Sequence, residues 1–139
     1  MNDTIEIQVR PYHVDLFRHV NNARYLEFLE EARWSFWESF SGFSTLADRG
    51  WTFMVVRIEI NYRLGAEAFQ VLEIRTELEG LGERSGRLRQ VVRLKGADSL
   101  VADAEVVFVV VDKASGKALP MSVVGPAVFA ESASGAGHE

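Results

Sequence analysis

The chain has 139 residues, of which 47% are hydrophobic and 25% are charged, and this composition is typical of an ordinary globular protein. Its length predicts one domain, and the absence of cysteine excludes disulfides, thiolate metal sites and a cysteine nucleophile. The formal net charge of -5 disfavours a broad nucleic-acid-binding surface and a basic membrane-surface patch, so an anionic ligand would need local arginines.

The first two predicted elements are a strand and a long helix. Over Thr4–Arg10 apolar and polar residues alternate until Pro11 interrupts the pattern, which is typical of a half-buried strand. The pair Asn21 and Asn22 can cap a helix, and apolar residues follow at helical spacing up to a predicted end at Gly42. Those apolar residues are Tyr25, Leu26, Phe28, Leu29, Ala32, Phe36, Trp37 and Phe40.

Four further strands are predicted after the helix, separated by turns that contain glycine. They are Thr52–Tyr62, Phe69–Leu78, Gly86–Leu94 and Leu100–Val111. In the first of these strands, the residues expected on the buried face are Met54, Val56, Ile58 and Ile60. A strand, a long helix and four more strands predict an α+β protein in which an antiparallel five-stranded sheet wraps around a long central helix.

The C-terminal part of the chain is expected to be less regular. A short turn or helix is predicted near Met121–Val128. Residues 131–139 are small and polar, so we expect a disordered tail there and a folded domain over residues 1–130. No apolar run has the length of a membrane helix, and the N-terminus has no apolar signal core, so we expect a cytoplasmic protein without membrane insertion.

Polar residues gather just before the predicted helix, and Asp15 is the carboxylate among them. A helix N-terminus presents unpaired backbone N–H groups that can stabilise oxygen as it gains negative charge. A carboxylate placed nearby could attack a carbonyl carbon or activate a water molecule. On composition and spacing alone, the simpler interpretation is that Asp15 turns the chain and that Asn21 and Asn22 cap the helix.

The segment YHVD followed by HVNNARYLEFLEEARW resembles the hotdog-fold acyl-CoA thioesterases of the 4-hydroxybenzoyl-CoA thioesterase superfamily, above all their long-chain acyl-CoA branch. The similarity extends through INYR, ERSGRLRQVV and VADAEVVFVVVD. It implies a hotdog fold and hydrolysis of medium- to long-chain acyl-CoA without a cofactor. It also implies that Asp15 is the catalytic aspartate, acting as general base or nucleophile, and that the Asn22 backbone N–H receives the thioester oxygen.

Three alternatives stay open. Plant acyl-carrier-protein thioesterases carry Asp-x-Asn-x-His before a similar HVNN, and here Asp15 and His19 match while Phe17 replaces the asparagine, which favours the acyl-CoA branch. The chain could also be a non-catalytic acyl-CoA-binding or sensing module. His19 could act as an acid–base group or as a packed, hydrogen-bonded loop residue.

Arginines in the middle strands are candidates for binding the phosphates of coenzyme A, because guanidinium groups bind phosphate in bidentate fashion. Arg63, Arg84 and Arg87 are the predicted phosphate ligands, and Tyr25 is a predicted substrate contact as well as a core residue. The three histidines lack metal-ligand spacing, so no metal is expected. Uncovered strand edges and an apolar outer face near Val109 predict a homodimer or homotetramer.

Overall fold

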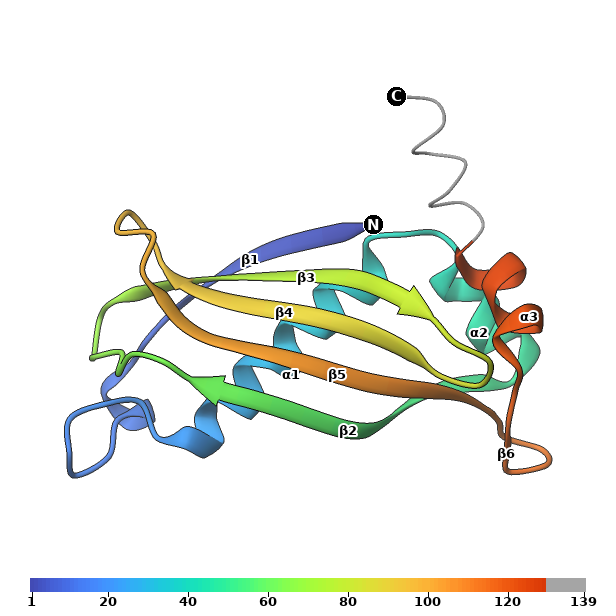
Figure 1. Cartoon of the computed structure of the whole chain (residues 1–139), viewed down its shortest axis with the longest axis horizontal. Coiled ribbons are helices and arrows are strands. Elements are labelled where there is room, and N and C mark those ends of the chain that lie inside the picture. The colour runs from blue at the N-terminus through green and yellow to red at the C-terminus, as the bar shows by residue number, and fades with distance from the viewer. Residues whose placement is uncertain (130–139) are drawn as a thin grey trace.

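The computed structural model describes residues 1–129, so the predicted tail at 131–139 lies outside the described residues. Five long strands form one antiparallel sheet in the order β1-β3-β4-β5-β2 (Figure 1). Their bounds are β1 Asn2–Gln8, β2 Trp51–Tyr62, β3 Val71–Leu81, β4 Gly86–Leu94 and β5 Leu100–Asp112. A short sixth strand, β6 Lys117–Ala118, pairs with the end of β5.

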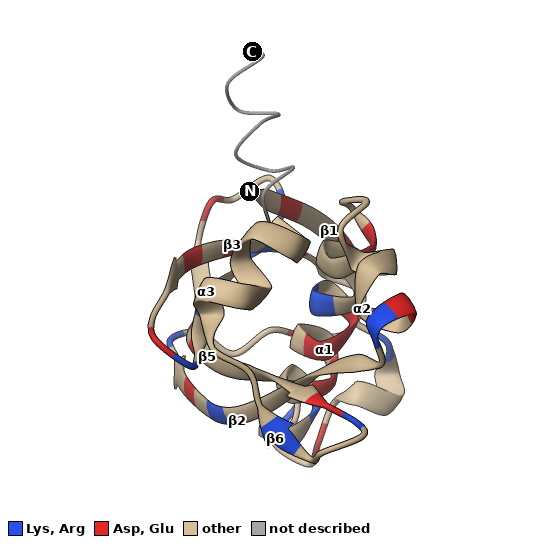
Figure 2. Ribbon diagram, turned by 90° about the vertical axis from the view of Figure 1, so that its right-hand side faces the viewer, with Lys and Arg blue, Asp and Glu red and all other residues tan. Residues whose placement is uncertain are grey.

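The sheet curls around the long helix α1, Asn22–Glu38, as the end-on view in Figure 2 shows. The predicted α+β class and the hotdog arrangement of sheet and helix are confirmed. β1 and β2 form the two edges of the sheet, so the strand that precedes α1 and the strand that follows it lie farthest apart. Within residues 1–129, no helix is both long and apolar enough to cross a membrane.

Helix α1 begins where the sequence places its cap, because the Asn21 side chain accepts a hydrogen bond from the Ala23 N–H at 2.9 Å. The predicted end at Gly42 is wrong. α1 ends at Glu38, where Ser39 donates its hydroxyl to the Phe36 carbonyl and so satisfies a terminal acceptor. The chain then forms a second helix, α2 Phe43–Arg49, which Gly50 terminates at a φ of 70°.

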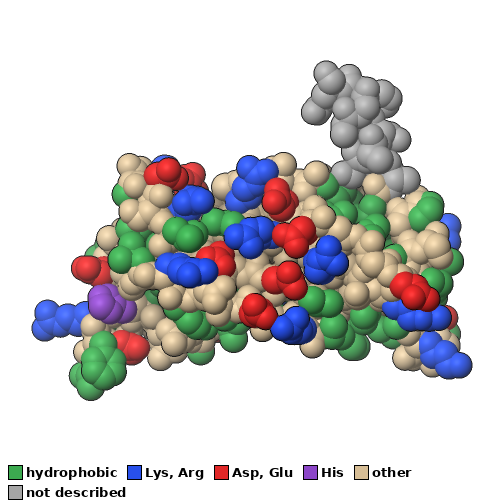
Figure 3. Space-filling view, viewed as in Figure 1, with side chains coloured by type: hydrophobic (Ala, Val, Ile, Leu, Met, Phe, Trp, Pro, Cys, Tyr) green, Lys and Arg blue, Asp and Glu red, His purple; other side chains and the backbone are tan. Residues whose placement is uncertain are grey.

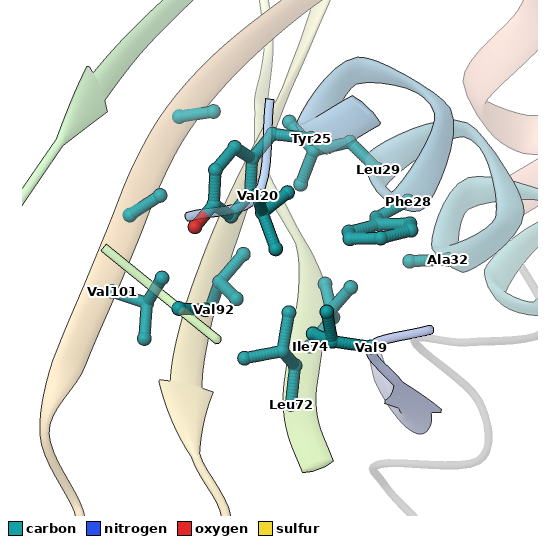
Figure 4. Close-up of a cluster of buried hydrophobic side chains, with 13 residues drawn as sticks. Val9, Val20, Tyr25, Phe28, Leu29, Ala32, Leu72, Ile74, Val92 and Val101 are labelled. Atoms are coloured by element: carbon teal, nitrogen blue, oxygen red, sulfur yellow. The ribbon is translucent and has the colours of Figure 1, made fainter. Parts of the chain in front are cut away.

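The core divides into two clusters along α1. The first packs Tyr25, Phe28 and Leu29 against apolar side chains of β3, β4 and β5 (Figure 4). The second surrounds Phe36 and Trp37 and includes residues of two short elements near the C-terminus. These are α3 Met121–Val124 and the π-helical turn η2 Gly125–Phe129, in the region where a turn or helix is predicted. Both halves of α1 are therefore buried on the sheet side.

The burial pattern predicted for β2 is wrong in the first half of the strand. Met54 and Val56 are exposed, at 50% and 56%, although alternation places them on the buried face. The reason is a β-bulge between Val55 and Arg57, which shifts the pairing with β5 and exchanges the two faces of the strand. Beyond the bulge Ile58 is half-buried, as expected. The bulge leaves an apolar stretch exposed on an edge strand.

Candidate active site

Asp15 lies in a tight hairpin loop between β1 and α1, closed by a bridge between Val14 and Val20. The Asp15 N–H donates to the His19 carbonyl at 3.1 Å, and the Arg18 N–H donates to the Asp15 carbonyl at 3.0 Å. The Asp15 carboxylate oxygen Oδ1 accepts from the Phe17 N–H at 2.9 Å. The side chain is exposed, and its other carboxylate oxygen is hydrogen-bonded to no group of residues 1–129.

The two asparagines at the start of α1 have different roles. Asn21 is the cap, and its own N–H donates to the His13 carbonyl at 2.9 Å. Asn22 is the first helical residue, and its N–H has no acceptor among the described residues. A backbone N–H at the first helical position points away from the helix and carries part of its positive dipole. The arrangement therefore leaves one donor free at this helix end.

Asn22 lines a cavity of about 260 Å³ between the start of α1 and the end of β2. The cavity brings together four predicted site residues: His19, Asn22, Tyr25 and Arg63. Asp15 does not line it, but it belongs to the same hairpin loop and is held to His19 through the backbone. The sequence reasoning missed Tyr62 and Gly65 as lining residues, although Tyr62 stands within the INYR segment.

Tyr25 has a buried hydroxyl that makes no hydrogen bond within residues 1–129. Figure 4 shows its ring beside Val20, with the hydroxyl directed away from α1. Burial raises the pKa of Tyr25, so the phenol stays protonated and remains a donor. An unpaired buried donor is costly, and the nearby Ala66 backbone lowers the pKa of Tyr25 against the larger effect of burial.

Arg63 forms an ion pair with Asp103, from Nε to Oδ2 at 2.9 Å. The Asn61 side chain donates to the other Asp103 oxygen at 3.1 Å. The hydrogen bond from Arg63 lowers the pKa of Asp103, so this carboxylate is ionised and fixes the arginine. The two terminal guanidinium nitrogens of Arg63 have no other partner among the described residues, so they remain available to an anion.

Similarity to known proteins decides the family. A profile of the Thioesterase-like superfamily matches residues 9–131. The long-chain acyl-CoA thioesterase FadM of Escherichia coli (strain K12) is 46% identical over 116 residues, which cover 84% of this chain and 88% of that protein. The chain belongs to the thioesterase-like superfamily. The predicted class of enzyme, a thioester hydrolase, is thereby confirmed.

Solved structures of other thioesterases have the same fold as this chain. The probable thioesterase YbaW from Escherichia coli matches with a TM-score of 0.84 at 44% identity, covering 86% of this chain and 90% of that one. The 12:0-ACP thioesterase from Umbellularia californica matches with a TM-score of 0.78 at 15% identity, covering 91% of this chain and 50% of that one. The second likeness concerns the fold alone, so the fold by itself does not separate CoA from carrier-protein substrates.

Two of the predicted phosphate ligands of the thioesterase lie far from the helix start. Arg84 is in the turn between β3 and β4 and donates to the Ala118 carbonyl at 3.2 Å. Arg87 follows on β4 and lies 3.6 Å from the Glu79 carboxylate. This turn is at the opposite end of the sheet from the hairpin that carries Asp15 (Figure 1). One protomer therefore does not bring Arg84 and Arg87 to the cavity that Arg63 lines.

Gly65 packs closely against the His19 ring, and a Cβ atom added there would lie 2.7 Å from His19 Cγ. The His19 side chain is exposed and can rotate away, so Gly65→Ala should change the free energy of unfolding by less than about 0.5 kcal/mol. Gly86→Ala provides the contrast, because its Cβ atom would lie 2.3 Å from the ring of Phe108, which is fully buried. This substitution should lower the free energy of unfolding by about 1–3 kcal/mol. Urea unfolding of both variants measures the difference, and equal losses would show that His19 is rigidly held.

Proposed function

We propose that this thioesterase hydrolyses acyl-CoA thioesters to the free acid and CoA. The observation that carries the proposal is the free Asn22 N–H, which begins a long buried helix beside a cavity that His19, Tyr25 and Arg63 also line. Such a donor can hydrogen-bond the thioester oxygen and stabilise the negative charge that forms on it. The 46% identity to a long-chain acyl-CoA thioesterase supports the same reaction.

Asp15 supplies the attacking or proton-accepting group in this proposal. As general base, it takes a proton from water, the resulting hydroxide adds to the carbonyl carbon, and the C–S bond breaks to release the CoA thiolate, which is then protonated. As nucleophile, its free oxygen adds to the carbonyl carbon, expels the thiolate and forms an anhydride, which water hydrolyses. In both routes the Asn22 N–H stabilises the oxyanion.

In this proposal an acyl chain of medium to long length lies along a seam between α1 and β2, marked by Leu26 on the helix and Val55 on the strand. These two side chains are 40% and 39% exposed. Covering such side chains with an acyl chain removes apolar surface from water and contributes about 25 cal/mol for each Å². Arg63 stands at the end of the seam near Asn22, where it can bind a phosphate of CoA.

Release of free thiol from a panel of acyl-CoAs, followed with a thiol-reactive dye, tests the proposed reaction. We expect turnover that rises from short to medium and long chains. Binding of acyl-CoA without thiol release would instead support a binding or sensing module. Hydrolysis of acyl-carrier-protein thioesters in preference to the same acyl-CoAs would support the carrier-protein alternative.

We also propose that the thioesterase is a homodimer or a homotetramer. The β2 edge exposes Met54, Val55 and Val56 in a row, and an open apolar edge strand is a template for pairing with another strand. The outer face of the sheet is covered mainly by charged side chains of both signs (Figure 3). The apolar β2 edge is therefore the stronger candidate for contact between protomers.

Sedimentation should give at least twice the 15.6 kDa mass of one chain, and Val56→Lys should shift it towards the monomer. A lysine on the edge strand opposes pairing through its charge. Val123→Lys is the matched control, because Val123 is exposed to a similar degree, 45%, but lies on α3. A wild-type monomer, or equal effects of the two lysines, would contradict this assignment of the edge.

A further inference from the structure

The four most exposed large apolar side chains of residues 1–129 lie in loops at one end of the sheet. They are Tyr12, Leu16, Phe17 and Phe69, at 69%, 90%, 79% and 61% exposure. The first three lie between β1 and α1, and the fourth lies between β2 and β3. This end is on the left in Figure 1, and hydrophobic side chains project from it in Figure 3. One exposed apolar residue is ordinary on a protein surface, but a group of them marks an interaction site.

Backbone hydrogen bonds join these loops into one surface. The Val20 N–H donates to the Ala66 carbonyl at 2.8 Å, and the Phe69 N–H donates to the Val9 carbonyl at 2.6 Å. Val9 and Val20 stand on either side of the segment that contains the other three exposed residues. The loop between β2 and β3 is therefore bonded to both ends of that segment, and the exposed side chains belong to one continuous end of the molecule.

Two residues of this end have an unusual backbone conformation. Arg18 has φ 68° and Phe69 has φ 73°. A positive φ is uncommon for any residue except glycine, and for a bulky aromatic residue it is a clear outlier. Such conformations persist where the surrounding structure enforces them, and they cluster at functional sites. The Phe69 ring is thus exposed to water in an unfavourable backbone conformation, which packing of the core does not explain.

The same end is cationic, although the whole chain has a net charge of -5. Residues 10–24 contain three arginines, and Asp15 is their only acidic residue. Arg24 is ion-paired within its own helix. Arg10 and Arg18 are exposed, and no carboxylate of residues 1–129 lies within ion-pair distance of them. Exposed cations beside exposed apolar side chains match the negative headgroups and the apolar boundary of an anionic bilayer.

We propose that this end of the molecule docks on the surface of an anionic phospholipid bilayer. Leu16 and Phe17 enter the boundary between headgroups and acyl chains, while Arg10 and Arg18 lie against lipid phosphates. Docking of this kind needs no segment that crosses the membrane, because interfacial anchors bury apolar side chains only at the boundary. An acidic carrier protein would match the two arginines but not the four exposed apolar side chains, so a lipid surface is the better match.

Docking by this end would bring the Asn22 cavity close to the lipid. His19, Leu64 and Gly65 line that cavity, and they belong to the same two loops that carry the exposed apolar residues. The proposed thioester site would therefore face a surface in which long-chain acyl compounds dissolve. The docking itself does not rest on the proposed hydrolysis, because it depends only on side chains outside the cavity.

Co-sedimentation with lipid vesicles tests the apolar part of the proposal. We expect the wild type to bind vesicles of phosphatidylglycerol and phosphatidylcholine in equal amounts, and to bind less well in high salt, which screens exposed charges. Leu16→Ser combined with Phe17→Ser should weaken this binding by at least about 10-fold, since both apolar contacts are lost. Leu81→Ser combined with Val123→Ser is the matched control and should bind as the wild type does. Leu81 and Val123 are exposed at the opposite end of the sheet.

The charged part is tested by Arg10→Gln combined with Arg18→Asn, because asparagine is well tolerated at a positive φ. Each arginine near an anionic surface contributes up to about 5-fold, so binding to the mixed vesicles should fall by about 5- to 25-fold. Binding to vesicles of pure phosphatidylcholine should not change. Lys113→Gln combined with Lys117→Gln removes the same charge near β6, at the opposite end, and should leave binding to both kinds of vesicle unchanged.

A fluorescent label locates the contact and decides the matter if the serine variant does not fold. The chain has no cysteine, so Phe17→Cys carries a single environment-sensitive dye. Its emission should shift to the blue on addition of the mixed vesicles, whereas the dye on Val123→Cys should not respond. The proposal is overturned if the wild type does not bind the mixed vesicles, if the dye at position 17 does not respond, or if the control variants lose as much binding.

A protein partner would give a different pattern. Binding to an acidic carrier protein that is lost in the arginine variant but kept in the serine variant, without binding to vesicles, would also overturn the proposal. Vesicle binding is measured without acyl-CoA and without thiol release. Failure of the proposed hydrolysis and failure of the proposed docking are therefore separate results.

Discussion

Replacing Asp15 with asparagine should leave the protein folded and reduce thioester hydrolysis by about 100- to 10,000-fold, the range that general acid–base catalysis contributes. The asparagine amide oxygen can still accept the Phe17 N–H, which the Asp15 carboxylate accepts at 2.9 Å, so the hairpin turn is retained. What the variant loses is the negative charge and with it the basicity and nucleophilicity of the side chain. Turnover should therefore fall without a comparable fall in stability.

Asp112→Asn is the matched control for this prediction. Asp112 is also an aspartate in a turn whose carboxylate accepts the N–H two residues on, here that of Ala114 at 3.1 Å. It lies at the end of β5, beside the turn that leads to β6, and it does not line the Asn22 cavity. Its replacement should leave kcat unchanged in the thiol-release assay. If Asp15→Asn retained wild-type turnover as well, Asp15 would be a turn residue only.

Alternation and capping predicted the parts of the fold that local sequence determines. β4 occupies the predicted range Gly86–Leu94, and its burial alternates along the strand as the sequence pattern predicts. β2 was misread because the bulge after Val55 depends on pairing with β5, which lies some 50 residues further along the chain. α2 was missed because its seven residues are too few to show a helical repeat.

Only those residues of the site that lie close together in the sequence could be predicted as a group. Asp15, His19 and Asn22 lie within eight residues, so one motif contains them all. Tyr62 and Gly65 reach the same cavity through the sheet, and only the three-dimensional fold brings them there. Arg63 and Arg84 look alike in the sequence, yet the length of the sheet separates them (Figure 1). The sequence likewise carried no sign that Arg33 is buried, because arginine on a helix is usually exposed.

The free N–H of Asn22 can be removed while every other residue that lines the cavity stays the same. Asn22→Pro deletes this donor at the first helical position, where proline is favoured because the N–H has no partner within the helix. Proline also requires an extended conformation of the residue before it, and Asn21 already has φ -62° and ψ 137°. The Tyr62 hydroxyl can still donate to the carbonyl of residue 22, as it does at 3.3 Å. We therefore expect a folded variant.

This proline variant should bind acyl-CoA and hydrolyse it about 100- to 1,000-fold more slowly, because the loss of one oxyanion donor costs that factor in other enzymes. Asn22→Ala keeps the N–H and should retain nearly all activity, since Asn21 and not Asn22 supplies the capping side chain. Thiol release gives kcat, and titration with a non-hydrolysable thioether analogue of acyl-CoA gives binding. A folded alanine variant without activity, beside an active proline variant, would assign the chemistry to the Asn22 side chain instead of the helix terminus.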